Sequence, residues 1–425
     1  MSTMKSKLLI LIFAFCLLFI GLTTQPKSAK TLPPWELIDS PWPTHAHDFQ
    51  RTSRSSYTGI EDGVHIAWSY PYGPVQSQSL TVGSNGLIYA KSYNTYVFSP
   101  QGELIRQDLP GGSCQSSPTH LANETIFYAA GSNWIGMYSS GDVFWTANMP
   151  LSCFRYSPAV TKDGIGYFMY GYFGSSYYIY AIDLLTRELL WTYKMGGWSS
   201  MSLGHDDTLY VSGLYGGLEA IQSDGSLKWQ RLDFFETGYQ YRSQVMTIGD
   251  DGTIYVSRFK DANLDGLADD NVDSVRALDS DGNILWDYIL DPSLWSCGFA
   301  LSQSGTLYVA TGQMNFANKT VTLYAIRSDG NLKWSTILPT SYACGGPVTD
   351  IANNVYLCAR NGYCYGFSES GEMLWDIFVS DGWLDTYPLI YDDKQMYIAT
   401  KDGVAALEEG DPVYSYFFLP YIIDN

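Results

Sequence analysis

The sequence predicts an all-β fold, a β-propeller ring of eight four-stranded antiparallel blades. Three observations predict it: a phrase ending in Trp recurs along the chain, an alternating strand pattern precedes each copy, and the composition favours strands. The 425 residues include 34 Tyr, 13 Trp and 40 Gly. Aromatic side chains suit pleated, half-buried surfaces, and glycines suit the tight turns between strands.

The recurring phrase consists of a small residue, a turn and a terminal Trp. Five copies are plain: AIDLLTRELLW, AIQSDGSLKW, ALDSDGNILW, AIRSDGNLKW and GFSESGEMLW. Two copies are weaker, MYSSGDVFW and VFSPQGELI, and the second places Ile105 at the Trp position. Each Trp is expected to stack on the neighbouring blade, so substituting it would report on folding. The residues assigned to blade docking are Trp68, Trp145, Trp191, Trp229, Trp286, Trp334 and Trp375.

Ahead of each phrase stands a turn followed by an alternating strand, as in DGTIYVSR and SGTLYVAT. Alternation at period two indicates half-buried strands, and each unit supplies about four of them. Seven units are complete, and an eighth, from Trp383 to Leu407, stops before its last strand. HIAWSYPY, around Trp68, has the form of that missing strand, so we expect it to close one ring spanning residues 59–409.

AIDLLTRELLW resembles the tryptophan-docking motif A-x-D-x-x-T-G-x-x-x-W of pyrroloquinoline-quinone-type propellers, with Arg187 in the place of the Gly. The other copies resemble the shorter variant of cell-surface and outer-membrane-assembly propellers. Residues 42–59, WPTHAHDFQRTSRSSYTG, are similar to the leader that precedes such rings in secreted bacterial proteins. The resemblance implies architecture, whereas function depends on the site that the ring carries.

The N-terminus has the form of a secretory signal over residues 1–24, because Lys5 and Lys7 precede an apolar run from Leu8 to Leu22. The run is shorter than the roughly 20 residues that span a bilayer, and cleavage and anchoring both stay open. A leader follows over residues 25–58. The tail, residues 410–425, is apolar but also too short to span. We therefore expect a secreted or cell-surface protein with no transmembrane span in the mature chain.

The formal charge of −19 disfavours nucleic acid and anionic membranes as partners. Cations, sugars and proteins remain. The five His show no zinc spacing, and His45 and His47 in the leader are interpreted as a surface pair.

An insertion in the fifth unit, DANLDGLADDNVD at 261–273, carries the pattern of a calcium loop. Oxygen ligands alternate before Gly266, which permits the sharp turn. Val272 occupies the position of the usual bidentate acid, and Asp273 comes one residue later. The alternative is an acidic, solvated hairpin tip. The predicted ligands of a structural Ca²⁺ are Asp261, Asn263, Asp265, Leu267, Asp269 and Asp273.

Six cysteines follow the signal, an even number that favours disulfides in an exported chain, with free buried thiols as the alternative. Equivalent places in adjacent units pair Cys114 with Cys153 and Cys297 with Cys344. Cys358 and Cys364 flank a hairpin turn and are expected to face each other.

Quinoprotein dehydrogenases share the predicted fold, but this chain has no adjacent Cys-Cys pair and no C-x-x-C-H. We therefore expect a monomeric, non-catalytic binding or scaffolding propeller without pyrroloquinoline quinone, and a quinoprotein-type oxidoreductase is the alternative. The turns entering the innermost strands are aromatic and are expected to ring one channel mouth, where they bind protein or carbohydrate or else only pack between blades. This rim consists of Tyr156, Trp198, Tyr239, Tyr241, Trp295, Tyr342 and Trp383.

Overall fold

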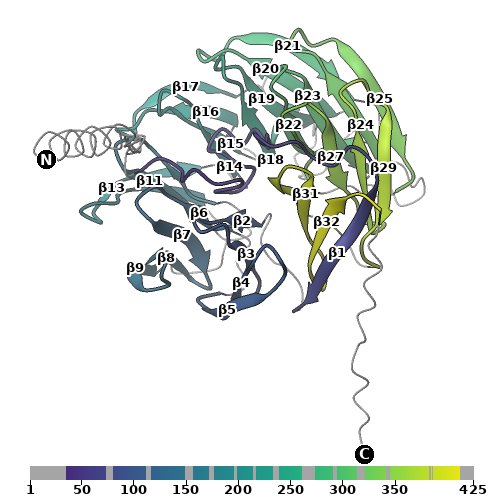
Figure 1. Cartoon of the computed structure of the whole chain (residues 1–425). Helices are drawn as coiled ribbons and strands as arrows, with labels where there is room; N and C mark the ends of the chain where they lie inside the picture. Colours follow the sequence, from purple (N-terminus) through teal and green to yellow (C-terminus); the bar gives the residue numbers. More distant parts are fainter. Residues whose placement is uncertain are drawn as a thin grey trace, which may run out of the picture. The chain divides into compact units, whose positions relative to one another are not determined.

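The computed structural model confirms the predicted ring: eight four-stranded antiparallel sheets surround a central axis (Figure 1). The described residues contain strands and no helix. Among these described residues, no helix is long and apolar enough to cross a membrane. The structure describes residues 35–72, 80–111, 116–148, 157–171, 177–195, 199–213, 217–232, 239–260, 273–290, 294–313, 321–340, 345–381, 384 and 386–411.

Blades 1 to 7 each run from the axis outward in chain order. Blade 1 consists of β2 (Thr81–Val82), β3 (Ile88–Lys91), β4 (Thr95–Phe98) and β5 (Leu104–Leu109). Blade 2 consists of β6 (Thr119–His120), β7 (Thr125–Ala130), β8 (Asn133–Tyr138) and β9 (Val143–Asn148). Blade 3 consists of β10 (Ala159–Val160), β11 (Ile165–Gly171), β12 (Tyr177–Asp183) and β13 (Leu189–Met195). Blade 4 consists of β14 (Ser199–Leu203), β15 (Leu209–Gly213), β16 (Gly217–Ile221) and β17 (Leu227–Arg231).

The second half of the ring repeats the arrangement. Blade 5 consists of β18 (Tyr239–Ile248), β19 (Ile254–Lys260), β20 (Asp273–Leu278) and β21 (Ile284–Ile289). Blade 6 consists of β22 (Leu294–Leu301), β23 (Leu307–Gln313), β24 (Val321–Ile326) and β25 (Leu332–Leu338). Blade 7 consists of β26 (Val348–Thr349), β27 (Val355–Cys358), β28 (Tyr363–Phe367) and β29 (Met373–Phe378). Blade 8 consists of β30 (Leu389–Asp392), β31 (Gln395–Ala399), β32 (Gly403–Glu409) and β1 (Val64–Pro71).

Blade 8 closes the ring as the sequence predicts. Strand β1 is its outermost strand and pairs antiparallel with β32, from Val64 opposite Glu409 to Pro71 opposite Gly403. Segments from the two ends of the ring therefore join within one sheet, which closes the ring.

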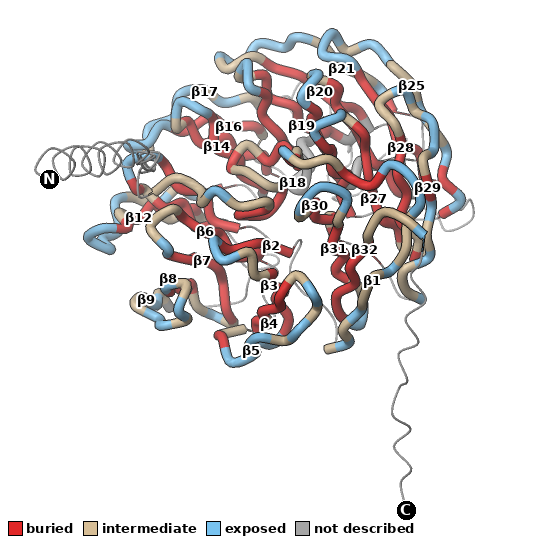
Figure 2. The backbone as a smooth tube through the Cα atoms, in the orientation of Figure 1, coloured by how far each residue is buried: buried red, intermediate tan, exposed pale blue. Residues whose placement is uncertain are grey.

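The core lies between the blades. The middle strands β7 and β24 are buried along their whole length, whereas the outermost β21 alternates between exposed and half-buried residues. Figure 2 shows the same gradient, with buried residues inside and exposed residues on the rim. Strands packed on both faces read as continuous apolar runs, and the outer strands keep a solvent face.

A Trp on the outermost strand holds each of six blades to the next. The indole N–H of Trp191, for example, donates to the Ser223 carbonyl at 2.9 Å. The ring of Trp191 also covers Gly225, whose φ is 86° and where a Cβ would lie 2.9 Å from the indole. The equivalent bonds join Trp68 to Pro100, Trp229 to Ser280, Trp286 to Ser328, Trp334 to Glu369 and Trp375 to Ile60.

Blade 2 is joined to blade 3 in a different way. Trp145 packs on Phe127 and Phe168, with ring centroids 6.1 and 5.4 Å away. The facing turn of blade 3 carries Arg187 at φ 66°, in the left-handed region that the usual Gly prefers. The Arg187 guanidinium lies 5.3 Å from the centre of the Phe144 ring, so a cation–π contact accompanies the substitution.

In blade 1 the docking position belongs to Arg106, and the prediction of Ile105 is wrong. Arg106 lies opposite Val97, as each docking Trp lies opposite a small residue of its neighbouring strand, whereas Ile105 points to solvent and is 49% exposed. The Arg106 guanidinium covers Gly141 and donates to the Ser140 carbonyl at 2.6 Å. It therefore makes the two contacts that an indole makes elsewhere.

Replacing Arg106 tests this equivalence. We expect R106A to lower the free energy of unfolding by about 1 kcal/mol, because it removes a charged hydrogen bond at a partly exposed site. R106W should retain the stability of the wild type, since an indole fits the same glycine and carbonyl. Urea unfolding compares the two variants. Equal losses in both would show that Arg106 does not dock the blade.

Candidate functional site on the ring axis

The leader crosses the middle of the ring, where the innermost strands end (Figure 1). Main-chain carbonyls of the leader accept hydrogen bonds from the last residues of these strands at 2.8 to 3.0 Å. A segment that bonds to so many blades must lie at the axis. The pairs are Val82 with Trp42, His120 with Pro43, Leu203 with Phe49, Ile248 with Gln50, Leu301 with Thr52 and Thr349 with Ser53.

The leader is buried in this position. Trp42 is fully buried, and Ala46, Thr52 and Ser53 are at most 2% exposed. Ala46 and Ser53 also have φ of 53°, left-handed values that cost free energy in residues with a Cβ. The leader thus lies across one end of the ring axis, buried against the ends of the innermost strands.

Arg51 places a charge at the axis. Its guanidinium donates to the carbonyls of His45 at 2.8 Å and Asp48 at 3.4 Å within the leader, and of Ser157 at 3.0 Å in blade 3. Tyr387 of blade 8 packs on the His45 ring with centroids 5.1 Å apart. Blades 3 and 8 lie on distant sides of the ring, so a group between them is close to its centre.

The environment of Arg51 keeps it charged at neutral pH. Burial lowers the pKa of Arg51 to about 10, against the opposing effects of Asp48 and Tyr387. Burial, followed by the charge of Arg51, lowers the pKa of His45 well below its usual value, so His45 is neutral. The Asp48 carboxylate accepts from the Thr52 amide at 2.9 Å and bonds to the Thr52 hydroxyl, and together with His47 these bonds lower its pKa despite burial.

Buried hydroxyls surround the axis. Among the described residues, the hydroxyls of Ser53 and Thr349 are buried without a hydrogen-bond partner. Ser53 lies two residues after Arg51, and its carbonyl accepts from the Thr349 amide at 2.9 Å. Hydroxyls and a guanidinium are the donors that oxyanions prefer. The innermost strands and their flanks carry further buried hydroxyls at Thr81, Ser116, Ser117, Thr119, Ser157, Ser200, Ser202, Thr247 and Thr386.

The interpretation of His45 as part of a surface pair is wrong, because His45 is only 9% exposed beneath Tyr387. His47 packs edge-on against Trp42 with centroids 5.1 Å apart. Sequence reasoning missed Arg51 as well. Successive leader residues contact different blades, so no periodic pattern in the sequence distinguishes Arg51. The resemblance of the segment to other leaders was the one feature that could have drawn attention to it.

The predicted aromatic rim stays a prediction, because the structure describes only part of it. Tyr239 and Tyr241 lie at the start of β18 and Trp295 at the start of β22, whereas the leader contacts the ends of these strands. The side chains of these three residues lie outside the described part of the structure. So do Tyr156, Trp198, Tyr342 and Trp383.

The predicted calcium loop joins β19 to β20. Asp261, Asn263, Asp265, Leu267 and Asp269 lie outside the described residues, and Asp273 is described only as the first residue of β20. The site stays a prediction. Among the described residues, no group of three or more His, Cys, Asp and Glu side chains is placed to hold a metal ion.

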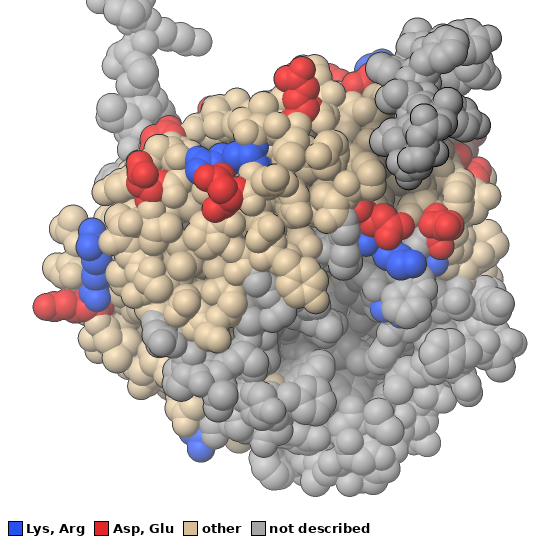
Figure 3. Space-filling view, turned by 90° about the horizontal axis from the view of Figure 1, so that it is seen from below, with Lys and Arg blue, Asp and Glu red and all other residues tan. Residues whose placement is uncertain are grey.

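Close to this insertion, basic and acidic side chains pair within blade 5. Arg276 forms a two-pronged ion pair with Asp287 at 2.7 and 2.8 Å, and Arg258 reaches the same carboxylate at 3.1 Å. Such pairing is also visible on the surface, where blue and red atoms lie beside one another in the described part of the view from below (Figure 3).

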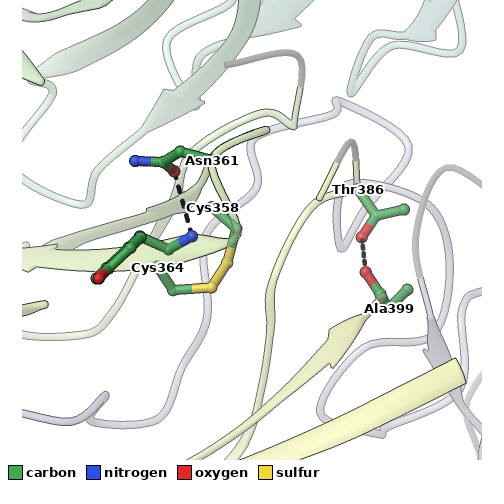
Figure 4. The surroundings of a disulfide bond; sticks show 6 residues. Cys358, Asn361, Cys364, Thr386 and Ala399 are labelled. Carbon is green, nitrogen blue, oxygen red and sulfur yellow. Dashed lines mark hydrogen bonds between the residues drawn. A yellow bond between two sulfur atoms is a disulfide. The ribbon is translucent and has the colours of Figure 1, made fainter. Parts of the chain in front are cut away.

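Cys358 and Cys364 form a disulfide between β27 and β28, where they are register partners (Figure 4). At the turn between them, the Asn361 side chain accepts from the Tyr363 amide at 3.2 Å. Thr386, on the neighbouring blade 8, donates to the Ala399 carbonyl at 3.0 Å. Cys114, Cys153 and Cys344 and the side chain of Cys297 lie outside the described residues.

Comparison with known proteins assigns the chain to a family. Residues 175–411, more than half of the chain, match the family described as outer membrane protein assembly factor BamB. The chain belongs to this family. The description of this family names no carbohydrate ligand. No curated protein sequence matches the chain.

Solved structures similar to this member of the BamB family include enzymes. The quinohemoprotein alcohol dehydrogenase of Comamonas testosteroni is 15% identical, with a TM-score of 0.65 over 86% of this chain and 80% of the enzyme. A quinohemoprotein alcohol dehydrogenase of Pseudomonas putida HK5 is 13% identical, with a TM-score of 0.67 over 88% and 82%. BamB of Moraxella catarrhalis is 14% identical, with a TM-score of 0.57 over 81% and 99%.

These comparisons overturn the expectation of a non-catalytic binding or scaffolding protein. The two dehydrogenases match the ring at higher TM-scores than the assembly factor does. The comparisons therefore do not support the expectation that the protein is not an enzyme. At such identities the likeness establishes the fold, and an activity must be argued from the site.

Proposed function

We propose that this propeller is a quinoprotein-type oxidoreductase of the periplasm or cell surface, with a pyrroloquinoline-quinone-type cofactor on the ring axis. The observation that carries the proposal is Arg51, a buried charge near the ring axis whose guanidinium donates to main-chain carbonyls. A buried cation close to the axis suits a small anionic ligand better than a protein surface.

The donor set fits the cofactor, which is a planar tricarboxylate. Arg51 would hold a carboxylate, and the hydroxyls of Ser53 and Thr349 would donate to its remaining oxygens, which would satisfy polar atoms that lack partners among the described residues. When bound, the quinone supplies the oxidant for a two-electron oxidation of an alcohol. The burial of these groups in the protein would make their hydrogen bonds to a carboxylate strong.

A structural Ca²⁺ in the loop 261–273 is part of the proposal. It rests on the sequence pattern of oxygen ligands, and it concerns the stability of the hairpin β19–β20 rather than the axis.

Thermal unfolding tests both ligands, because a ligand that binds only the native state must stabilise it. We expect the melting temperature to rise from EGTA to Ca²⁺, and to rise again when pyrroloquinoline quinone is added. R51Q should weaken quinone binding by about 10- to 100-fold, the effect of losing one charged hydrogen bond. The matched control is R54Q, since Arg54 lies in the same leader but pairs with Asp250 at the surface, at 2.8 Å.

Each result has a distinct meaning. A quinone shift that R51Q abolishes and R54Q keeps supports the axial site. A wild-type protein that neither shifts with the quinone nor oxidises alcohols with an artificial electron acceptor contradicts the proposed activity. No response to Ca²⁺ contradicts the metal site alone.

A further inference from the structure

Exposed apolar side chains gather where the outer edges of blades 2 and 3 meet. In blade 3, the turn between β12 and β13 begins a run of six exposed residues, 185–190, three of which are leucines. The neighbouring turn of blade 2 exposes Tyr138 and Val143. The two turns lie side by side, because the Arg187 guanidinium is 5.3 Å from the centre of the Phe144 ring. We call this surface the blade 2–3 patch, and it consists of Tyr138, Val143, Leu185, Arg187, Glu188, Leu189 and Leu190.

The patch departs from the repeat in its exposed residues. The equivalent turn of blade 4, residues 222–226, has the polar sequence QSDGS, which leaves Leu227 as the one exposed apolar residue before the docking Trp. In blade 3, Leu185 is 79% exposed, more than any other large apolar side chain in the described part of the chain. The other apolar members of the patch are 44–55% exposed. Packing of the ring does not account for so exposed a leucine, whereas a docking surface does.

Two charged side chains of the patch lack ion-pair partners within the described part of the chain, namely Arg187 and Glu188. The Arg187 guanidinium rests on Phe144, and this contact leaves the N–H donors at its edge free to bind an acid. In blade 1, by contrast, Arg106 pairs with Asp108 of its own strand at 2.8 Å. The patch therefore offers one unpaired cation and one unpaired anion beside its leucines.

A surface with this composition is complementary to itself. A two-fold axis through the patch can bring Arg187 of one copy opposite Glu188 of the other, and the same pair then forms a second time. Leucine, tyrosine and arginine side chains also suit the centre of a protein interface. A lipid surface fits less well, because Glu188 would enter it without a counter-charge and the formal charge of −19 is repelled by anionic headgroups.

We infer that the blade 2–3 patch is the interface of a symmetric dimer, in which a second copy of this chain buries Leu185 and pairs Arg187 with Glu188 across the two-fold axis. The protein is then a dimer, whereas a monomer was expected from the sequence. The inference does not depend on the proposed quinone site, because the patch lies on the outer edge of the ring.

Light scattering after size exclusion of the whole chain, at several protein concentrations, measures the oligomeric state. We expect a dimer for the wild type and a monomer for L185D, because the new carboxylate would be buried in the interface without a partner. The matched control is I337D, which introduces the same charge on blade 6, where Ile337 is 68% exposed, and which should remain a dimer. Circular dichroism should show the same ring in both variants, since both positions are exposed.

A charge exchange tests the pairing itself. R187E should raise the dissociation constant of the dimer about 10- to 100-fold, because it places two carboxylates against each other at both contacts. The double variant R187E/E188R has the same two charges in exchanged positions and should return the dissociation constant close to the wild-type value. Loss of the contact with Phe144 cannot produce such a recovery, because the double variant lacks that contact as well.

Three results contradict the inference. A wild type that stays monomeric at every concentration shows that the patch does not bind a second copy, and binding of that monomer to phosphatidylcholine vesicles would assign the patch to lipid instead. A dimer that persists in L185D uses another surface. A dimer that R187E weakens and R187E/E188R does not restore lacks the pairing of Arg187 with Glu188.

Discussion

A chain without residues 35–58 is expected not to form a stable ring. The deletion leaves six amides at the ends of the innermost strands without their carbonyl partners, those of Val82, His120, Leu203, Ile248, Leu301 and Thr349. Each of these bonds contributes about 0.5–1.5 kcal/mol, and the deletion also removes the buried side chains of Trp42 and Phe49 from the core, whereas a whole domain is stable by only about 5–15 kcal/mol. Circular dichroism and size exclusion of the truncated protein measure the result.

A point variant tests the same contact with less disruption. W42A removes a fully buried indole and should lower the free energy of unfolding by about 3–5 kcal/mol. The matched control is W35A, the same substitution at a leader residue that is only partly buried, with a smaller expected loss of about 1–3 kcal/mol. A truncated chain that melts like the wild type, or a W42A variant no weaker than W35A, would show that the leader is an accessory to the ring.

The ring was predictable because repetition multiplies a weak signal. One Trp after a Gly turn has many explanations, but the same phrase in successive units has few, and the orphan strand around Trp68 then specified how the ring closes. The error at Ile105 has a local cause. Ile105 resembles Trp because it is apolar, and this likeness suggested the docking position. Strand alternation instead directs its neighbour Arg106 toward the next blade, where its aliphatic stem and guanidinium take the place of an indole.

The axial site was not predictable in the same way. Arg51 and His45 come from the leader, which does not repeat, and Tyr387 comes from the eighth unit, so nothing in the sequence indicates that they meet. His45 in particular follows Thr44 in a polar stretch typical of a surface. Its burial depends on the leader lying across the axis, which is a property of the assembled ring and of no local pattern.

Acid is expected to destabilise the protein already below about pH 6.5, well before carboxylates titrate. His120 is buried, its imidazole bonds to the Thr81 hydroxyl at 3.0 Å, and burial lowers its pKa to about 3. A histidine with a depressed pKa stabilises the folded state fully above the unfolded pKa, and the contribution is lost as the pH falls toward the folded pKa. His45 shifts in the same direction.

The size of this effect follows from linkage. Each such histidine lowers the free energy of unfolding by about 1.4 kcal/mol per pH unit, so His120 alone contributes a loss of about 2 kcal/mol between pH 6.5 and 5. Urea unfolding at pH 7.5, 6.5 and 5 measures the slope. H120N should lower the pH dependence of the free energy of unfolding by the contribution of one proton, whatever it does to stability at pH 7.5. H205N, which changes a half-exposed histidine, should leave this pH dependence as it is. A wild-type slope of zero over this range would mean that His120 and His45 take up protons without disturbing the ring, and hence that the leader and blade 2 pack less tightly than their burial indicates.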